Sequence, residues 1–193
     1  MIPKGRVGIL GGTFDPPHFG HLVLAQEAVD RFDLLKVLFV PTRRPPHKQS
    51  HRLTPLGKRL RMLQLSVAGE DSFEVADLES TTGYSYTVDL LQALDRPAED
   101  TFFVMGMDAL LELDTWKQPD RLLGMASVVV GTRPGYDPEG VRREFVESVR
   151  IFEIPGLWIS STQVRERFAL GRPTKYLIPE SARTFILREA IYG

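Results

Sequence analysis

Short apolar segments and amphipathic segments alternate along almost the whole chain, and this alternation limits the folds open to it. Apolar segments of strand length occupy residues 6–10, 36–40, 73–76, 101–105, 126–130 and 151–154. Helical spacing of apolar side chains occupies residues 19–32, 56–68, 87–94, 141–149, 161–170 and 179–191, with short helical pieces in 110–123. Alternating strands and helices favour parallel pairing. We therefore expect an α/β fold, a Rossmann-like doubly wound parallel sheet with helices on both faces and a small C-terminal helical region.

The length of 193 residues suits one domain of roughly 100–200 residues, and we find no linker long enough to divide it. We expect a single domain over 1–193 whose C-terminal helical part covers about 160–193. The chain has no cysteine, which excludes disulfides, thiolate zinc sites, iron–sulfur clusters and a cysteine nucleophile. No stretch approaches the ~20 apolar residues of a membrane span, and the N-terminus is too short and polar for a signal peptide. A cytoplasmic protein with no membrane partner is expected.

The formal net charge of −1 hides two segments of opposite charge. Between Asp33 and Glu70 there are Lys and Arg residues but no acidic ones, whereas residues 62–95 hold Asp and Glu but no Lys or Arg. A run of like charge is usually a solvated face, although a basic loop can also close over phosphates. The basic run lacks the interleaved aromatic residues of a single-strand binder, so no nucleic-acid partner is expected.

The segment between the first strand and the first helix reads Gly11-Gly-Thr-Phe-Asp-Pro-Pro-His-Phe-Gly-His21. Glycines let the backbone approach a ligand closely, and a helix start offers free N–H groups and a positive dipole end. The segment is neither a Walker A loop nor a G-x-G-x-x-G fingerprint. His18 and His21 can turn both rings to one side and donate hydrogen bonds to phosphate oxygens. Asp15 and the prolines are interpreted as loop architecture.

Two alternatives stand beside the phosphate interpretation of the histidines. They can be ordinary surface or capping residues, or they can bind a metal, which is disfavoured because metal-binding histidines on a helix more often lie four residues apart with carboxylate or cysteine help. A second motif, Ile159-Ser-Ser-Thr-x-x-Arg165, precedes the last helical region. Ser161 or Thr162 can simply cap that helix, but hydroxyls, helix-end N–H groups and Arg165 also suit a phosphate cradle.

Both motifs resemble those of the nucleotidylyltransferases related to class I aminoacyl-tRNA synthetases. In that superfamily the His-x-x-His pair binds the triphosphate of the nucleotide donor, and the Ser-Ser-Thr run holds the β and γ phosphates. Further pieces resemble one branch, the bacterial nicotinate-nucleotide adenylyltransferases: Pro45-Pro-His-Lys48, Ser85-Tyr-Thr87, Gly106-Met-Asp108 with Thr115-Trp116, Arg133-Pro-Gly-Tyr136 and Tyr176-Leu-Ile-Pro179. Their order and spacing extend the resemblance over nearly the whole chain.

The resemblance implies a donor site, an acceptor site and a reactive set. The ATP-binding residues would be Gly11, Gly12, Thr13, Phe14, His18, His21, Gly106, Asp108, Arg133, Ser161, Thr162 and Arg165. The nicotinate mononucleotide residues would be Asp15, His47, Lys48, Ser85, Tyr86, Thr87 and Trp116, with the tryptophan stacked on the pyridine ring. The catalytic residues would be His18, His21, Lys48 and Arg165. Mg²⁺ is expected with ATP, without dedicated protein ligands.

The implied reaction is transfer of AMP from ATP to nicotinate mononucleotide, giving nicotinate adenine dinucleotide and pyrophosphate. Nicotinamide mononucleotide and phosphopantetheine remain alternative acceptors, and a non-catalytic nucleotide- or RNA-binding module is a different class of alternative. Two residues depart from the pattern of many relatives: Tyr84 stands where they have proline, and Lys117 stands where they have tyrosine. Both adjoin the expected pyridine pocket.

Overall fold

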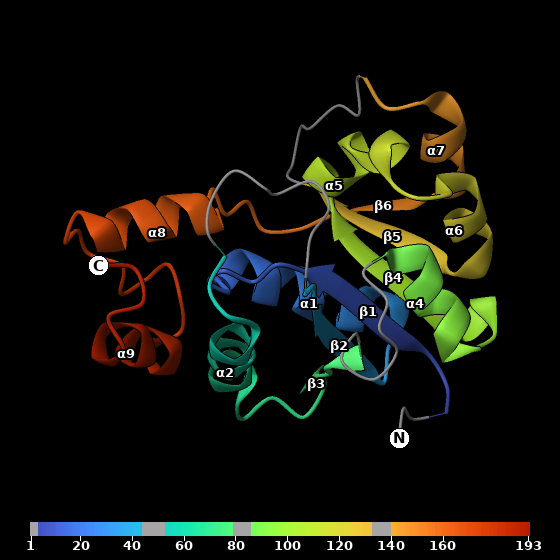
Figure 1. Cartoon of the computed structure of the whole chain (residues 1–193). Helices are drawn as coiled ribbons and strands as arrows, with labels where there is room; N and C mark the ends of the chain where they lie inside the picture. The colour runs from blue at the N-terminus through green and yellow to red at the C-terminus, as the bar shows by residue number, and fades with distance from the viewer. Residues whose placement is uncertain (1–3, 44–52, 79–85, 133–139) are drawn as a thin grey trace.

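A six-stranded, wholly parallel sheet forms the centre of the molecule in the computed structural model, which describes residues 4–43, 53–78, 86–132 and 140–193. The strands are β1 (Val7–Gly12), β2 (Lys36–Pro41), β3 (Phe73–Val75), β4 (Thr101–Gly106), β5 (Ser127–Thr132) and β6 (Arg150–Glu153). Their order is β3-β2-β1-β4-β5-β6 (Figure 1). The six strands expected from the sequence are confirmed, and so is the doubly wound parallel arrangement.

Helices cover both faces of the sheet. They are α1 (Phe19–Phe32), α2 (Leu56–Val67), α4 (Thr87–Leu94), α5 (Met107–Leu111), α6 (Pro119–Met125), α7 (Arg143–Ser148), α8 (Ser161–Ala169) and α9 (Glu180–Arg188), with the short helices η1 (Ala98–Asp100) and η2 (Leu113–Thr115). On one face α1 and α2 bury a cluster against the strands, with Leu24 and Leu63 among its members. On the other face α4 to α7 bury a second cluster, with Leu90, Leu122 and Phe145 among its members.

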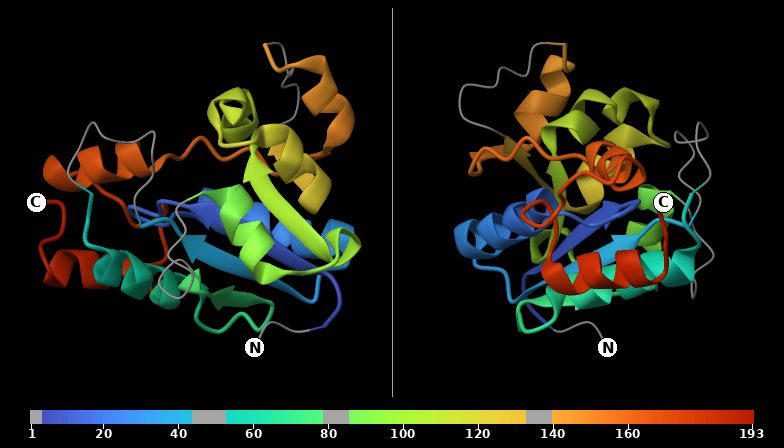
Figure 2. Two further views of the ribbon diagram at one scale, coloured as in Figure 1. Left: turned by 45° about the vertical axis from the view of Figure 1, so that its right-hand side comes forward. Right: turned by 90° about the vertical axis from the view of Figure 1, so that its left-hand side faces the viewer.

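The C-terminal region forms a small third layer beside α2. Val164 of α8, Ile186 of α9 and the loop residue Ile178 pack on Met62 of α2, and all four side chains are fully buried. Figure 2 shows α9 lying alongside α2, at the end of the molecule away from β6. Since Leu63 of the same helix belongs to a cluster against the sheet, α2 joins the C-terminal region to the main core.

Close packing of α1 on the sheet depends on a glycine in β5. A Cβ atom at Gly131 would lie 2.3 Å from Cδ1 of Leu24, which is shorter than any van der Waals contact. The chain winds outward from β1 through β2 to β3, and then from β4 through β5 to β6 on the other side. The strand order therefore reverses between β1 and β4, and in such sheets ligands bind beyond the carboxyl ends of the strands at that position.

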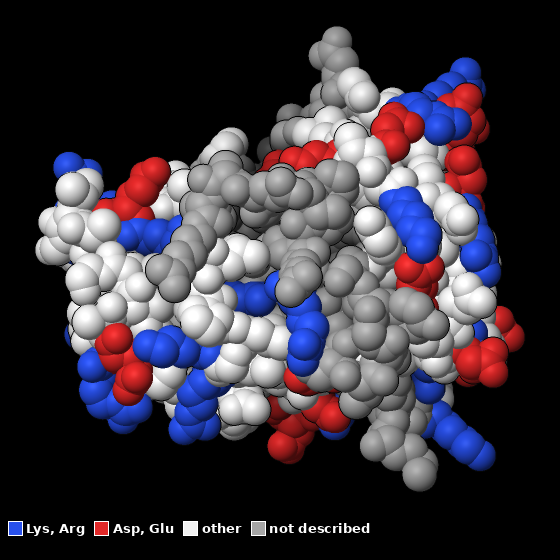
Figure 3. Space-filling view, in the orientation of Figure 1, with Lys and Arg blue, Asp and Glu red and all other residues white. Residues whose placement is uncertain are grey.

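The two oppositely charged segments of the sequence meet in space. Lys36 from the acid-free segment pairs with Glu74 from the base-free segment at 2.7 Å, because β2 and β3 are neighbours. On the face drawn in Figure 3, the Lys and Arg side chains of described residues are interspersed with Asp and Glu. Among the described residues, no helix is both long and apolar enough to cross a membrane.

Candidate active site

The carboxyl ends of β1, β4 and β5 open into a cavity of about 830 Å³. Its walls come from the loop after β1, the start of α1, the β4–α5 junction, the residues around Trp116 and the segment that leads into α8. These segments are far apart in the sequence and include both motifs singled out above. The cavity lies at the reversal of strand order, where a ligand site is expected in this class of sheet.

The rings of His18 and His21 stack in this cavity with their centroids 3.7 Å apart. His18 is the N-cap residue of α1 and is only 7% exposed. Its backbone N–H donates to Nδ1 of His21 at 3.1 Å, so a neutral His21 carries its proton on Nε2. Burial lowers the pKa of His18 to about 4, so this imidazole is neutral near pH 7. The buried Nδ1 of His18 finds no hydrogen-bond partner among the described residues.

Gly20 in the first turn of α1 and the buried Phe14 of the loop after β1 hold the two histidines in place. A Cβ atom at Gly20 would lie 3.0 Å from two atoms of the His18 ring, so a side chain at this position would push the ring aside. Phe14 sits behind His21, edge-on at 4.9 Å, and is 1% exposed. Its backbone adopts φ 50°. Phe14 is therefore a core side chain that supports the site, although part of it borders the cavity.

Asp15 is almost completely buried and its carboxylate is engaged by the protein. Oδ1 accepts a hydrogen bond from the hydroxyl of Tyr192 at 2.6 Å, and Oδ2 accepts from the backbone N–H of Thr54 at 3.1 Å. The backbone carbonyl of Asp15 accepts from Nη1 of Arg165 at 2.7 Å. These contacts agree with the interpretation of Asp15 as loop architecture, and sequence reasoning missed Tyr192 altogether.

Sequence reasoning also missed Arg59, which the sequence places only within the basic run. Its side chain is 1% exposed and donates to the carbonyls of Thr54, Thr13 and Thr42 at 2.9, 2.7 and 2.9 Å. It thereby joins α2 to the loops after β1 and β2. One signal was present: Arg59 precedes Met62 by three residues and so falls on the apolar face of its helix.

The second motif lies at the start of α8, directly beside the histidine loop. The capping expectation for Ser161 or Thr162 is wrong, because Ser160 is the N-cap and forms a capping box with Gln163. Ser161 instead donates to the carbonyl of Pro16 at 2.8 Å. Thr162 accepts from Nη2 of Arg165 at 3.1 Å, and all three motif residues border the cavity.

The remaining described residues of the expected sites border the same cavity. A Cβ atom at Gly106 would meet nothing within 4 Å, so this strand end leaves open space, and Asp108 follows on the exposed side of α5. Trp116 is half-buried and packs edge-on against Phe103 at 6.0 Å. Tyr86 and Thr87 form the start of α4.

Gly11, Gly12 and Thr13 complete the expected residues on the cavity wall. Four expected site residues lie outside the described part of the chain: His47, Lys48, Ser85 and Arg133. Within the part that the structure describes, no group of three or more His, Cys, Asp or Glu side chains is arranged to hold a metal ion.

A doubly wound parallel sheet with a His-x-x-His helix start at its switch point defines the class of nucleotidyl-transferring α/β proteins. The family model described as Cytidylyltransferase-like matches residues 9–167. A probable nicotinate-nucleotide adenylyltransferase of Desulfitobacterium hafniense (strain Y51) is 43% identical, over 98% of this chain and 97% of the relative. A probable nicotinate-nucleotide adenylyltransferase of Thermoanaerobacter sp. (strain X514) is 40% identical, over 97% of this chain and 94% of the relative.

Solved structures agree with the fold. The Plasmodium falciparum nicotinic acid mononucleotide adenylyltransferase complexed with NaAD matches with a TM-score of 0.80 at 18% identity, over 98% of each chain. The chain therefore belongs to the cytidylyltransferase-like family and, within it, to the nicotinate-nucleotide adenylyltransferases. The resemblance inferred from the motifs is confirmed.

Proposed function

We propose that this protein transfers AMP from ATP to nicotinate mononucleotide, releasing pyrophosphate and forming nicotinate adenine dinucleotide. The observation that carries the proposal is the stacked pair of His18 and His21 at a helix start, inside a cavity of about 830 Å³, in a chain of this family. A similar enzyme has been solved with NaAD, which consists of an AMP half and a nicotinate mononucleotide half.

The chemistry asks little of a general base. The attacking group is the 5′-phosphate of the acceptor, which is already anionic near pH 7 because its second pKa is about 6. It attacks the α-phosphorus of ATP, the bond to the β-phosphate oxygen breaks, and pyrophosphate leaves. The obstacle is repulsion between two polyanions, so the protein must position them and neutralise their charge.

The described residues suit those tasks. His18 and His21 would donate N–H groups to the triphosphate and to the charge that develops on the α-phosphate. The low pKa of His18 keeps its ring neutral, and a neutral imidazole still has one N–H group to donate. No proton transfer therefore has to come first. Ser161, Thr162, Arg165 and the start of α8 would hold the β and γ phosphates until pyrophosphate departs.

The acceptor would lie toward α4 and Trp116. The indole presents a flat face to a pyridine ring. The start of α4, at Tyr86 and Thr87, offers backbone N–H groups to the nicotinate carboxylate. Lys48 and His47 are proposed to align the acceptor phosphate, Ser85 to join the carboxylate contacts, and Arg133 to lie beside the adenosine. Asp15 is proposed to act through the loop that it supports.

Mg²⁺ is proposed to enter as the counter-ion of ATP, held by triphosphate oxygens and water, where it neutralises charge. We further propose that residues 1–193 act as one nucleotidylyltransferase domain, since α2 contributes both to the sheet core and to the C-terminal layer. ATP and nicotinate mononucleotide are the proposed partners, without nucleic acid or membrane, in the cytoplasm.

The test is an acceptor panel. The purified protein is incubated with ATP, Mg²⁺ and, in turn, nicotinate mononucleotide, nicotinamide mononucleotide and phosphopantetheine, and pyrophosphate release is measured. We expect the highest kcat/KM with nicotinate mononucleotide and the mass of nicotinate adenine dinucleotide among the products. Faster turnover of either other acceptor, or no pyrophosphate from any of them, contradicts the proposal.

A further inference from the structure

Tyr192, the next-to-last residue, lies against the loop that carries the two histidines. Its hydroxyl donates a hydrogen bond of 2.6 Å to Oδ1 of Asp15, across 177 positions of sequence. Asp15 is 1% exposed, and its second oxygen accepts from the backbone N–H of Thr54. A buried carboxylate is costly unless hydrogen bonds replace its lost hydration. The phenol of Tyr192 is one of the donors that make this buried charge tolerable.

The phenol is held as a donor with a fixed direction. Burial and the neighbouring carboxylate of Asp15 raise the pKa of Tyr192 far above its usual value, so the hydroxyl keeps its proton. The ring lies 5.9 Å from that of Phe168, and its hydroxyl lies 3.8 Å from Sδ of Met62. The aromatic ring therefore packs against the core of the C-terminal layer, while its hydroxyl reaches out of that layer to the first loop.

Tyr192 differs from the other contacts between the C-terminal layer and this loop. Arg165 and Ser161 donate to main-chain carbonyls of the loop, and both also border the cavity. Tyr192 reaches the side chain of Asp15 and does not border the cavity. Its hydroxyl also interacts with the side chain of Thr54. An influence of Tyr192 on ATP is therefore indirect, and its contact within the histidine loop is Asp15, which lies three residues before His18.

We propose that Tyr192 is a positioning residue for nucleotidyl transfer: through its hydrogen bond to Asp15 it holds the histidine loop in the geometry that receives the triphosphate. Without the hydroxyl, the Asp15 carboxylate would stay buried with one donor fewer and would turn toward other donors. The loop between Phe14 and His18 would move with it. Small displacements of binding groups cost much of the rate in a reaction that depends on positioning. A test of this proposal by kcat/KM rests on the proposed function, whereas a test by the affinity for an ATP analogue does not.

The variant that isolates the hydroxyl is Tyr192→Phe, which keeps the ring packing. We expect kcat/KM for ATP to fall about tenfold, the cost of one donor to a buried charge, while KM for nicotinate mononucleotide changes by less than about twofold. A second measurement is the affinity for an ATP analogue with a methylene group between the α and β phosphorus atoms, determined by calorimetry without acceptor. This affinity should fall by the part of the loss in kcat/KM that arises from weaker ATP binding.

Two controls separate positioning from general loss of structure. Tyr176→Phe removes the same hydroxyl from a residue of the C-terminal region that is 81% exposed, and wild-type kinetics are expected. Ile191→Ala removes packing from the same layer without touching the hydrogen bond. If Ile191→Ala lowers the thermal midpoint at least as much as Tyr192→Phe but keeps kcat/KM for ATP within about twofold, the loss belongs to the hydroxyl.

A double-variant cycle tests whether Tyr192 acts through Asp15. In an Asp15→Asn background the buried charge is gone, so adding Tyr192→Phe should cost less than about threefold in kcat/KM. The proposal is overturned if Tyr192→Phe costs about tenfold in both backgrounds, so that the losses of the two substitutions multiply. It is also overturned if Tyr192→Phe alone keeps the wild-type ATP affinity and kcat/KM. If no acceptor yields pyrophosphate with the wild-type protein, the proposed function fails, and the analogue affinities of the same variants still test Tyr192.

Discussion

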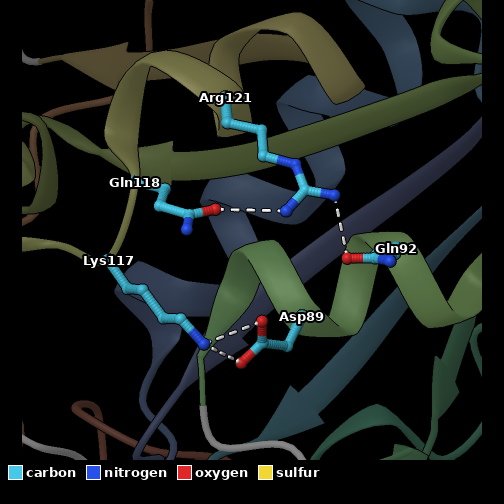
Figure 4. Close-up of polar contacts among 5 residues, drawn as sticks. All are labelled: Asp89, Gln92, Lys117, Gln118 and Arg121. Atoms are coloured by element: carbon cyan, nitrogen blue, oxygen red, sulfur yellow. Dashed lines mark hydrogen bonds and ion pairs between the residues drawn. The ribbon is translucent and has the colours of Figure 1, made fainter.

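The Nζ atom of Lys117 lies 2.7 and 3.0 Å from the two carboxylate oxygens of Asp89. Figure 4 shows this pair bridging the segment after Trp116 and the first turn of α4. The same ammonium lies 4.9 Å from the centre of the Tyr86 ring. Lys117 and Tyr86 both border the cavity. Lys117, one of the two residues that depart from the pattern of many relatives, therefore links the segment after Trp116 to the start of α4, the two sides of the proposed pyridine pocket.

Lys117→Met should weaken acceptor binding. Loss of the ion pair and of the contact with Tyr86 frees the start of α4 relative to Trp116, and we expect KM for nicotinate mononucleotide to rise about threefold to tenfold with KM for ATP unchanged. Steady-state kinetics with each substrate varied in turn measure this.

Arg121→Met is the matched control for Lys117→Met. Arg121 makes contacts with Gln92 of α4 at 2.9 Å and with Gln118 at 3.1 Å, but it does not border the cavity (Figure 4). Arg121→Met should leave KM for ATP and KM for nicotinate mononucleotide unchanged. An equal rise in acceptor KM for the two variants would show a general effect of loosening α4.

His18→Ala and His21→Ala should each lower kcat by about two to three orders of magnitude, the usual cost of a group that stabilises charge in the transition state. The folded structure should persist, because neither side chain anchors a core cluster. Pyrophosphate release measures the rate, and circular dichroism checks the fold. Near-normal turnover in both variants would remove the histidines from the mechanism.

Trp116→Ala should act mainly on the acceptor. Its indole is half-buried, borders the cavity and packs edge-on against Phe103. We expect KM for nicotinate mononucleotide to rise about tenfold, since aromatic stacking and apolar burial are lost. Trp158→Ala is the control, because that indole is 78% exposed and does not border the cavity. An unchanged acceptor KM in Trp116→Ala would make this tryptophan a structural residue alone.

Arg59→Met should destabilise the fold. It removes charged donors from the carbonyls of Thr13, Thr42 and Thr54 and leaves those buried acceptors short of partners. We expect a loss of about 3 kcal/mol in the free energy of unfolding, measured with urea. Arg61→Met removes an exposed charge from the same helix and should stay within about 0.5 kcal/mol of wild type. Equal values for the two variants would contradict the role given to Arg59.

Acid should destabilise the protein through His18. In the folded state its pKa is about 4, below the usual value of 6.5, because burial disfavours the charged ring. The unfolded chain therefore binds more protons between these two values, and stability is lost as the pH falls through that window. From about pH 6.5 to about pH 5 the cost is about 2 kcal/mol. Urea unfolding of His18→Gln should show a pH dependence weaker by this amount, and identical slopes would refute the assignment.

The alternation of apolar strands and helices was enough to predict the sheet and its layers. Strand segments such as 102–105 and 128–130 are apolar throughout, because a parallel sheet covered on both faces buries the side chains of its central strands. The motif residues could also be grouped in advance, since the carboxyl ends of parallel strands meet at one edge. The cap of α8 is Ser160 and not Ser161 or Thr162, because three consecutive hydroxyl residues make the choice depend on backbone geometry.

Local patterns identify strands, helices and the two phosphate-type motifs because each depends on residues close together in the chain. The supports of the site depend on distance in space. Tyr192 reaches Asp15, Arg59 joins three loops, and Lys117 pairs with Asp89, although no spacing in the sequence connects these residues. Burial then changes their chemistry: it lowers the pKa of His18 and turns an arginine of a basic run into a core residue. The tertiary structure removes water from these groups and supplies their hydrogen-bond partners. It alone therefore determines which charged side chains are buried and which residues stabilise them.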